Sequence, residues 1–238
     1  MILLEKLTKQ YTGSSLPALD RIDLSINPGE ITVIFGENGA GKSTLIKIIS
    51  CLLEPTTGNC YINGYHTVKE KHGAKKICGM LMGAETGLYA RLTAYENIKY
   101  FADLNRIPAE IFKSRLDYFS GIFNMHKYLN RRCGEFSFGM KQKTAIARAF
   151  IHDPEIILLD EPTTGLDITS SLIMHDFIRR CRQEGKTIIF STHRMDEITK
   201  LADRIIILKE GSAVYDNMIK NTGRSSRLEK ILLKYISK

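Results

Sequence analysis

A glycine-rich loop and the lysine that ends it carry the clearest chemistry in the sequence. Residues 36–43 read Gly-Glu-Asn-Gly-Ala-Gly-Lys-Ser and fit the pattern G-x-x-x-x-G-K-[ST]. Glycines allow successive N–H groups to turn inward around an anion, and a helix that starts beside them adds the positive end of its dipole. The pattern predicts a site for a nucleotide with Mg²⁺. Its expected binding residues are Gly36, Asn38, Gly39, Gly41, Lys42, Ser43 and Thr44.

The individual side chains of this loop have distinct expected roles. Lys42 supplies a mobile positive charge for the β- and γ-phosphates, and the Ser43 hydroxyl can ligate Mg²⁺. Thr44 can add a hydrogen bond to a phosphate oxygen.

Two adjacent carboxylates follow an apolar run later in the chain. Residues 156–159 are Ile-Ile-Leu-Leu, and Asp160 and Glu161 come directly after them. A buried parallel strand delivers its last residues to the edge of the sheet where α/β proteins bind ligands. We expect Asp160 to hold the Mg²⁺ shell and Glu161 to polarise an attacking water.

Composition excludes several classes of protein. The chain has 238 residues, of which 43% are hydrophobic and 25% are charged, as in folded globular proteins. It has no apolar run of the roughly 18 to 20 residues that a membrane span needs, and its start does not resemble a secretory signal. The five cysteines form no CxxC pair, so we expect neither disulfides nor a zinc site, and a reducing cytosol. The net charge of +8 allows a nucleic acid or an anionic membrane surface as partner.

Apolar runs alternate with helical patterns, which predicts an α/β fold with a mostly parallel sheet and helices on both faces. Residues 91–150 differ, because they carry eleven Lys and Arg against five Asp and Glu and have mainly helical spacing. We interpret this segment as a helical insertion. The expected strands are 2–7, 22–26, 31–35, 58–64, 156–159, 187–190 and one that begins at 205, and the expected helices are 43–52, 94–104, 111–123 and 170–184.

Further motifs in the same order along the chain resemble those of ATP-binding cassette (ABC) ATPases. Residues 136–143, Phe-Ser-Phe-Gly-Met-Lys-Gln-Lys, resemble the family's signature and precede Asp160 at the usual interval. Residues 164–167, Thr-Gly-Leu-Asp, resemble the D loop, and residues 191–193, Ser-Thr-His, resemble the H-loop switch. Tyr11 stands where the family places an aromatic residue against adenine.

The resemblance implies a fold and an organisation. It implies one ABC ATPase domain over residues 1–238, with the P-loop NTPase fold. Residues 1–88 and 150–238 would form a RecA-like core with an N-terminal antiparallel β subdomain. Residues 89–149 would form the helical subdomain that carries the signature.

The resemblance also implies an activity, the hydrolysis of ATP with Mg²⁺ in a homodimer. Nucleotide would lie between residues 42–44 of one copy and Ser137 and Gly139 of the other. Glu161 would be the general base and His193 would contact the γ-phosphate. The remaining implied roles are stacking on adenine by Tyr11 and coupling of the two sites by Asp167.

Two departures from the family pattern affect these expectations. The signature usually reads L-S-G-G-Q, and here Phe138 and Met140 replace the first glycine and the glutamine. The glutamine of the Q loop, expected near position 83 or 84, is replaced by Gly83-Ala84. Glu85 is the candidate substitute for its link to the membrane partner.

Residues 87–97 are similar to those of ABC-2-type exporters, including bacterial sodium-efflux ATPases. This implies export, of sodium or a drug, through a separate membrane permease, and a place on the inner face of the cell membrane. The positive charge leaves open a second hypothesis, a non-transport ABC ATPase that acts on nucleic acid or a cytosolic assembly. The chain lacks the second cassette or coiled coil common in such proteins, so no nucleic acid is expected. A P-loop kinase or GTPase would leave the signature and D loop unexplained.

Overall fold

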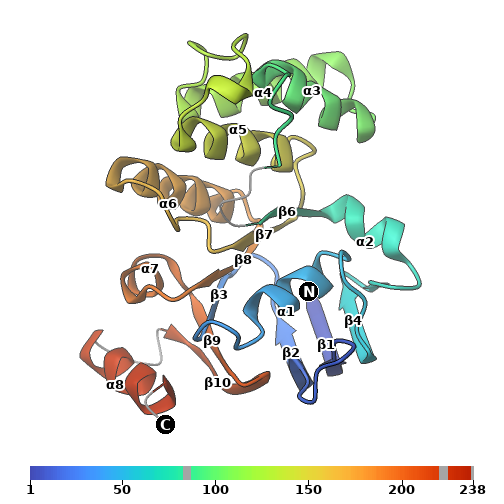
Figure 1. The fold of residues 1–238 in the computed structure, drawn as a ribbon, viewed down its shortest axis with the longest axis vertical. Coiled ribbons are helices and arrows are strands. Elements are labelled where there is room, and N and C mark those ends of the chain that lie inside the picture. The colour runs from blue at the N-terminus through green and yellow to red at the C-terminus, as the bar shows by residue number, and fades with distance from the viewer. Residues whose placement is uncertain (83–86, 220–224, 237–238) are drawn as a thin grey trace.

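A six-stranded sheet forms the centre of the molecule (Figure 1). The computed structural model describes residues 1–82, 87–219 and 225–236. Five strands of this sheet are parallel, and only the edge strand β10 runs antiparallel to its neighbour β9. The order across the sheet is β10 (Ser212–Met218), β9 (Arg204–Lys209), β3 (Ile31–Phe35), β8 (Thr187–Thr192), β7 (Ile156–Asp160) and β6 (Cys78–Met82).

Alternate residues of the central strands enter two separate hydrophobic cores. On β7, Ile157 and Leu159 belong to the core that packs on the helical side of the sheet. Ile156 and Leu158 belong to the core on the opposite face, which also includes Leu45. Both faces of β7 are therefore buried, which explains why its sequence is continuously apolar.

A second, antiparallel sheet lies beside the first and has the order β2 (Leu19–Ile26), β1 (Ile2–Lys9), β4 (Thr57–Ile62) and β5 (Tyr65–His66). Helix α1 (Lys42–Ile49) contacts both β4 of this sheet and β7 and β8 of the other. The N-terminal antiparallel sheet and the mostly parallel main sheet agree with the predicted fold class.

Three helices gather at one end of the molecule, away from the antiparallel sheet (Figure 1). They are α3 (Ala94–Leu104), α4 (Ala109–Phe123) and α5 (Phe138–Phe150). The others are α2 (Lys71–Ile77), α6 (Ile168–Gln183), α7 (Met195–Leu201) and α8 (Ser225–Ile236), with a short 3₁₀ turn at Cys133–Glu135. No helix in the described ranges is both long and apolar enough to cross a bilayer.

The structure changes several predicted boundaries. Helix α1 ends at Ile49 rather than 52, because Ser50 leaves the helical conformation and Cys51 has a φ of +59°. Strand β8 extends beyond residue 190 to Thr192. The elements that were not predicted from the sequence include α2, β5, β6 and α7.

Candidate nucleotide site

The glycine-rich loop joins β3 to α1 and is packed tightly against the rest of the chain. A Cβ atom at Gly36 would lie 2.4 Å from the carbonyl oxygen of Leu208 on β9. A Cβ atom at Gly41 would lie equally close to the carbonyl oxygen of Ala18, and Gly41 has a φ of +104° that favours glycine. The loop therefore needs glycine at both positions to keep its curled shape, while Asn38 and Gly39 are exposed at its crest.

Lys42 is held inside this loop. Its side chain is only 5% exposed, and its ammonium group donates hydrogen bonds to the carbonyl oxygens of Gly36 at 2.8 Å and Glu37 at 3.0 Å. Helix α1 begins here with no side-chain cap and no acidic residue in its first turn. The positive end of the helix dipole and a buried ammonium group thus meet at one place, which fits a phosphate group. Ser43 and Thr44 follow in the same turn, partly buried.

Asp160 ends β7 directly beside the end of β8. Its carboxylate accepts a hydrogen bond of 2.6 Å from the Ser191 hydroxyl, and Ser191 is its register partner on β8. The same hydroxyl accepts a hydrogen bond from the backbone N–H of Glu161 at 2.9 Å. A carboxylate fixed in this way, with the Ser43 hydroxyl and phosphate oxygens, is the oxygen ligand set that Mg²⁺ prefers.

Glu161 lies between two cationic or potentially cationic groups. One carboxylate oxygen, Oε1, is 3.7 Å from Lys42 Nζ and 3.6 Å from His193 Nδ1. The other oxygen accepts a hydrogen bond from the Thr164 hydroxyl at 3.2 Å. The backbone of Glu161 has a φ of +47°, which costs a non-glycine residue on the order of 1 kcal/mol or more. The surrounding hydrogen bonds hold the carboxylate in this strained position.

The signature and D-loop residues lie beside each other. Ser137 caps α5 by accepting a hydrogen bond from the Met140 N–H, and a Cβ atom at Gly139 would lie 3.1 Å from the Ser170 hydroxyl. Asp167 caps α6, and hydrogen bonds from the Ser170 N–H and hydroxyl lower the pKa of the Asp167 carboxyl. In the described part of the chain, no hydrogen bond or ion pair links Ser137 or Gly139 to residues 36–44.

Tyr11 lies over the start of α1. Its hydroxyl is 3.3 Å from the Thr44 hydroxyl, and Lys9 Nζ lies 5.5 Å from the centre of its ring. Tyr11 is 42% exposed. Gly83, Ala84 and Glu85, which replace the expected Q loop, lie outside the described residues.

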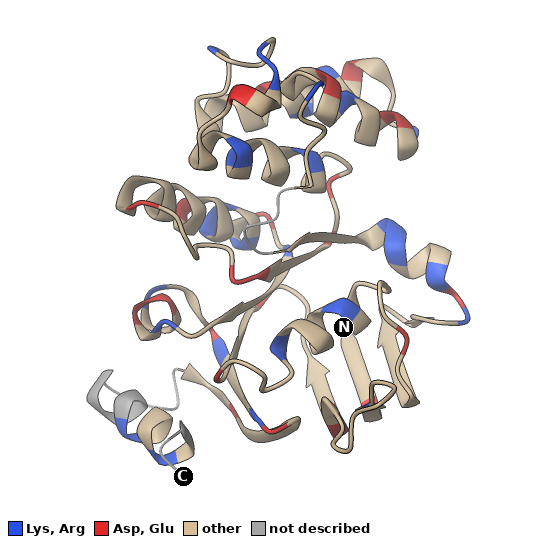
Figure 2. Ribbon diagram, in the orientation of Figure 1, with Lys and Arg blue, Asp and Glu red and all other residues tan. Residues whose placement is uncertain are grey.

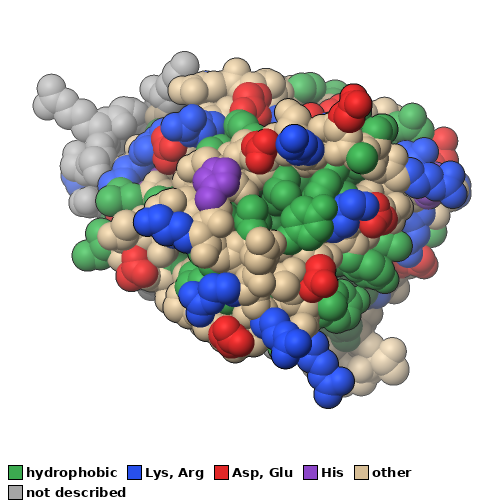
Figure 3. Space-filling model, turned by 90° about the horizontal axis from the view of Figure 1, so that it is seen from above, with side chains coloured by type: hydrophobic (Ala, Val, Ile, Leu, Met, Phe, Trp, Pro, Cys, Tyr) green, Lys and Arg blue, Asp and Glu red, His purple; other side chains and the backbone are tan. Residues whose placement is uncertain are grey.

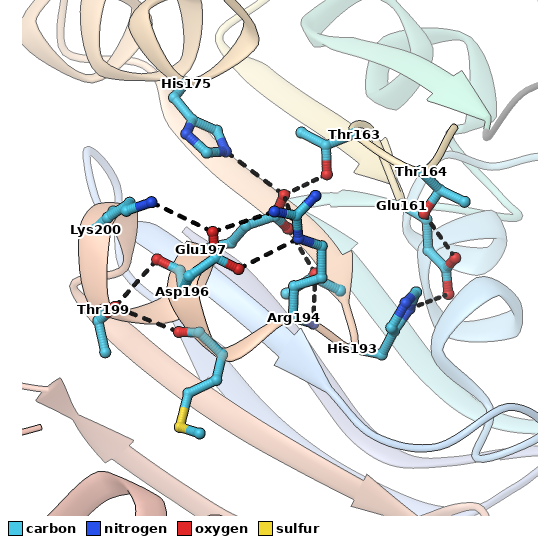
Figure 4. A network of polar contacts seen from close by, with 12 residues as sticks. Glu161, Thr163, Thr164, His175, His193, Arg194, Asp196, Glu197, Thr199 and Lys200 are labelled. Atoms are coloured by element: carbon cyan, nitrogen blue, oxygen red, sulfur yellow. Dashed lines mark hydrogen bonds and ion pairs between the residues drawn. The ribbon is translucent and has the colours of Figure 1, made fainter. Parts of the chain in front are cut away.

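The sequence analysis missed a buried polar cluster behind the site, in which Glu197 of α7 is the centre (Figure 4). Its carboxylate accepts hydrogen bonds from Thr163 and Thr192 and is 3.5 Å from His175 Nε2. One sequence feature could have indicated this cluster. Glu197 is an acidic residue four positions after His193, and the apolar Ile198 follows it directly.

Three comparisons with known proteins agree with this geometry. The profile of the family described as ABC transporter matches residues 19–164. The chain is 44% identical to the ABC transporter ATP-binding protein NatA of Bacillus subtilis (strain 168), over 100% of this chain and 98% of that protein.

Among solved structures, the chain resembles an ATP-binding subunit of an ABC transporter with a TM-score of 0.86 and 26% identity, over 98% of both chains. It also resembles the dimeric, post-hydrolysis ATP-binding cassette MJ0796 bound to ADP and phosphate, with a TM-score of 0.82 and 29% identity, over 92% of this chain and 99% of that one. These likenesses confirm the predicted ATPase activity and the predicted use of ATP and Mg²⁺. The chain belongs to the ABC transporter family, as an ATP-hydrolysing, ATP-binding subunit.

Proposed function

We propose that two copies of the chain bind ATP between them, head to tail, with residues 36–44 of one copy opposite Ser137 and Gly139 of the other. The observation that carries this proposal is a difference between the two halves of the expected site, which are residues 36–44 on one side and the signature with the D loop on the other. The glycine-rich loop is held by contacts within the chain, whereas exposed apolar side chains surround the signature and D loop. These are Phe138, Ile168 and Leu172, which are 38%, 82% and 56% exposed. Exposed apolar side chains in one region are typical of a surface that another protein covers. The dimeric state of the MJ0796 cassette supports the same arrangement.

The residues of the loop would hold the phosphates, and the two carboxylates would divide the chemistry. Asp160 and Ser43 would hold Mg²⁺, which would withdraw charge from the phosphate oxygens. Glu161 would accept a proton from the attacking water, and His193, 3.6 Å away, would contact the γ-phosphate. Asp167 would connect the two sites across the dimer, and Tyr11 would stack on adenine.

We further propose that this dimer drives export through a separately encoded ABC-2-type permease at the inner face of the cell membrane. A groove between α2, β6 and α3 supports it, with two cavities of about 650 and 390 Å³ that share Asn105 and His152. Leu104 and Lys76 line the larger cavity, and Lys75 lines the smaller one. Figure 2 shows that basic positions are prominent on α2. Such a groove suits a short amphipathic segment of a partner protein.

The helical end of the molecule carries an excess of positive charge, since residues 91–150 hold eleven Lys and Arg against five Asp and Glu. On the face formed by this end, Lys and Arg side chains are mixed with hydrophobic and acidic ones (Figure 3). Anionic lipid head groups attract such a surface with about 1 kcal/mol for each Lys or Arg near the bilayer. The charge therefore fits a docked subunit close to the membrane. Efflux of sodium or a drug stays an expectation from the sequence resemblance.

Replacing Leu104 by Glu tests the permease proposal. Leu104 is 61% exposed, so the change should leave the melting temperature within a few degrees. When the Leu104→Glu chain is purified from native membranes, the amount of ABC-2-type protein recovered with it should fall at least tenfold. The matched control is Leu233→Glu on α8, which is also an exposed leucine and should keep it. Undiminished co-purification of Leu104→Glu, or recovery of the chain with nucleic acid in place of a membrane protein, would contradict the proposal.

A further inference from the structure

We propose that the buried carboxylate of Glu197 is a positioning residue that joins the two chain segments carrying Glu161 and His193. This inference rests on the roles proposed above for those two residues. Glu197 lies on α7 and is 1% exposed. Its contacts, and not a contact with nucleotide, would set the distance between the base and the switch histidine (Figure 4).

The first contact reaches the switch. Thr192 is the last residue of β8, and its hydroxyl donates a hydrogen bond of 2.5 Å to Glu197 Oε2. The same hydroxyl accepts a hydrogen bond of 3.0 Å from the backbone N–H of Arg194. A single hydroxyl thus connects the peptide on each side of His193 to Glu197. Because the hydroxyl must use its only proton toward Glu197, it is free to accept from Arg194.

The second contact reaches the base. The Thr163 hydroxyl donates a hydrogen bond to the other oxygen of the carboxylate, Oε1. Thr163 stands two residues after Glu161, in a turn closed by a hydrogen bond of 3.2 Å from the Thr164 N–H to the Glu161 carbonyl oxygen. The adjacent Pro162 carbonyl oxygen accepts a hydrogen bond from buried Gln142 on the signature helix. Glu197 therefore anchors the turn that holds Glu161 in its strained conformation.

The cluster requires an ionised carboxylate. His175 Nε2, 3.5 Å from Oε1, must carry a proton to donate to it. Burial acts to raise the pKa of Glu197, but hydrogen bonds from His175, Thr163 and Thr192 outweigh it and lower the pKa. A glutamine at this position has one acceptor oxygen and one NH₂ group, so it cannot accept from both hydroxyls in the same way.

Glu197→Gln is the main test, with steady-state hydrolysis and ATP affinity measured on the purified chain. We expect kcat to fall at least tenfold while KM for ATP and the affinity for ATP change less than threefold. Thr192→Val, which removes the hydroxyl at constant shape, should reproduce the loss, and Thr192→Ser should recover most of it. The double variant Thr192→Val/Glu197→Gln should be no slower than the slower single variant, because both changes break one chain of contacts.

Asp196→Asn is the matched control. Asp196 is the preceding carboxylate of α7, has a side chain that is 43% exposed, and pairs with Arg194 and Lys200. The Asp196→Asn variant should keep kcat within twofold of the unchanged chain. The inference is wrong if Glu197→Gln keeps kcat within twofold, if ATP affinity falls as much as kcat, or if Asp196→Asn loses as much. Normal turnover in Glu161→Gln would instead show that Glu161 is not the base. Loss of turnover in Glu161→Gln together with full turnover in Glu197→Gln would overturn this inference and leave the proposed base in place.

Discussion

The phosphate half and the signature half of the molecule differ in how far each is complete within one chain. In the phosphate half, Lys42, Asp160 and Glu161 are held by buried carbonyl oxygens, hydroxyls and one another. In the signature half, the hydrogen bonds that the Ser137 and Asp167 side chains make to described residues are to the first turns of their own helices, and their apolar neighbours are exposed. This difference indicates that one chain forms the phosphate-binding part of a nucleotide site by itself. On a separate surface, the same chain presents the signature residues that would complete the nucleotide site of a second copy.

Lys42→Ala should have the largest effect on ATP affinity, because it removes the buried cation from the phosphate half, which one chain forms by itself. The variant loses the charge for the phosphates and leaves the carbonyl oxygens of Gly36 and Glu37 without their donor. We expect ATP affinity to fall roughly 100-fold or more, which corresponds to about 3 kcal/mol. Calorimetric titration of ATP measures it, with Lys47→Ala on the same helix as control. Unchanged affinity would show that the loop does not hold the phosphates.

Ser137→Ala should separate the two halves. ATP binding to a single chain should change less than twofold, while turnover should fall about tenfold, since the hydroxyl would act on nucleotide held by the other copy. The change also removes a helix cap, which costs about 1 kcal/mol of stability. Thr93→Ala, which removes the cap of α3, controls for that cost and should keep its turnover. If Ser137→Ala weakens single-chain binding as Lys42→Ala does, the two halves are not separate.

Tyr11→Ala should have the smallest effect of the three. Loss of one stacking contact of about 1 kcal/mol raises KM for ATP about fivefold and leaves kcat unchanged. Tyr11→Phe keeps the ring but loses the hydroxyl near Thr44, and should retain most of the affinity. An equal loss in both variants would assign the effect to the hydroxyl rather than to stacking. Competition with a fluorescent nucleotide distinguishes the two outcomes.

The sequence predicts the elements whose determinants are local. The bounds of α3 are those expected from helical spacing, and Thr93 and Glu96 form a capping box at its start. The central strand β7 is apparent because burial on both faces makes it continuously apolar. The loop of residues 36–43 is likewise a local pattern, and the structure supplies the reason for its glycines in the nearby carbonyl oxygens.

The features that the sequence did not predict depend on residues far apart in the chain. Strand β6 contains Gly79, which is needed because Phe150 of α5 packs against it. The Glu197 cluster draws its members from β8, from the turn after β7, and from α6 and α7. Each of these residues alone has an ordinary sequence context, so only the fold shows that one carboxylate joins them.

The central claim is that two copies hold ATP between the loop of one and the signature of the other. The most direct test is the mass in solution of Glu161→Gln with saturating ATP and Mg²⁺, measured by light scattering. Because the variant should bind ATP without turning it over, we expect a dimer that contains two nucleotides and dissociates when Ser137 is also changed to Glu. A monomer that binds one ATP with full affinity, or a dimer that the added Ser137→Glu change leaves intact, would contradict the account.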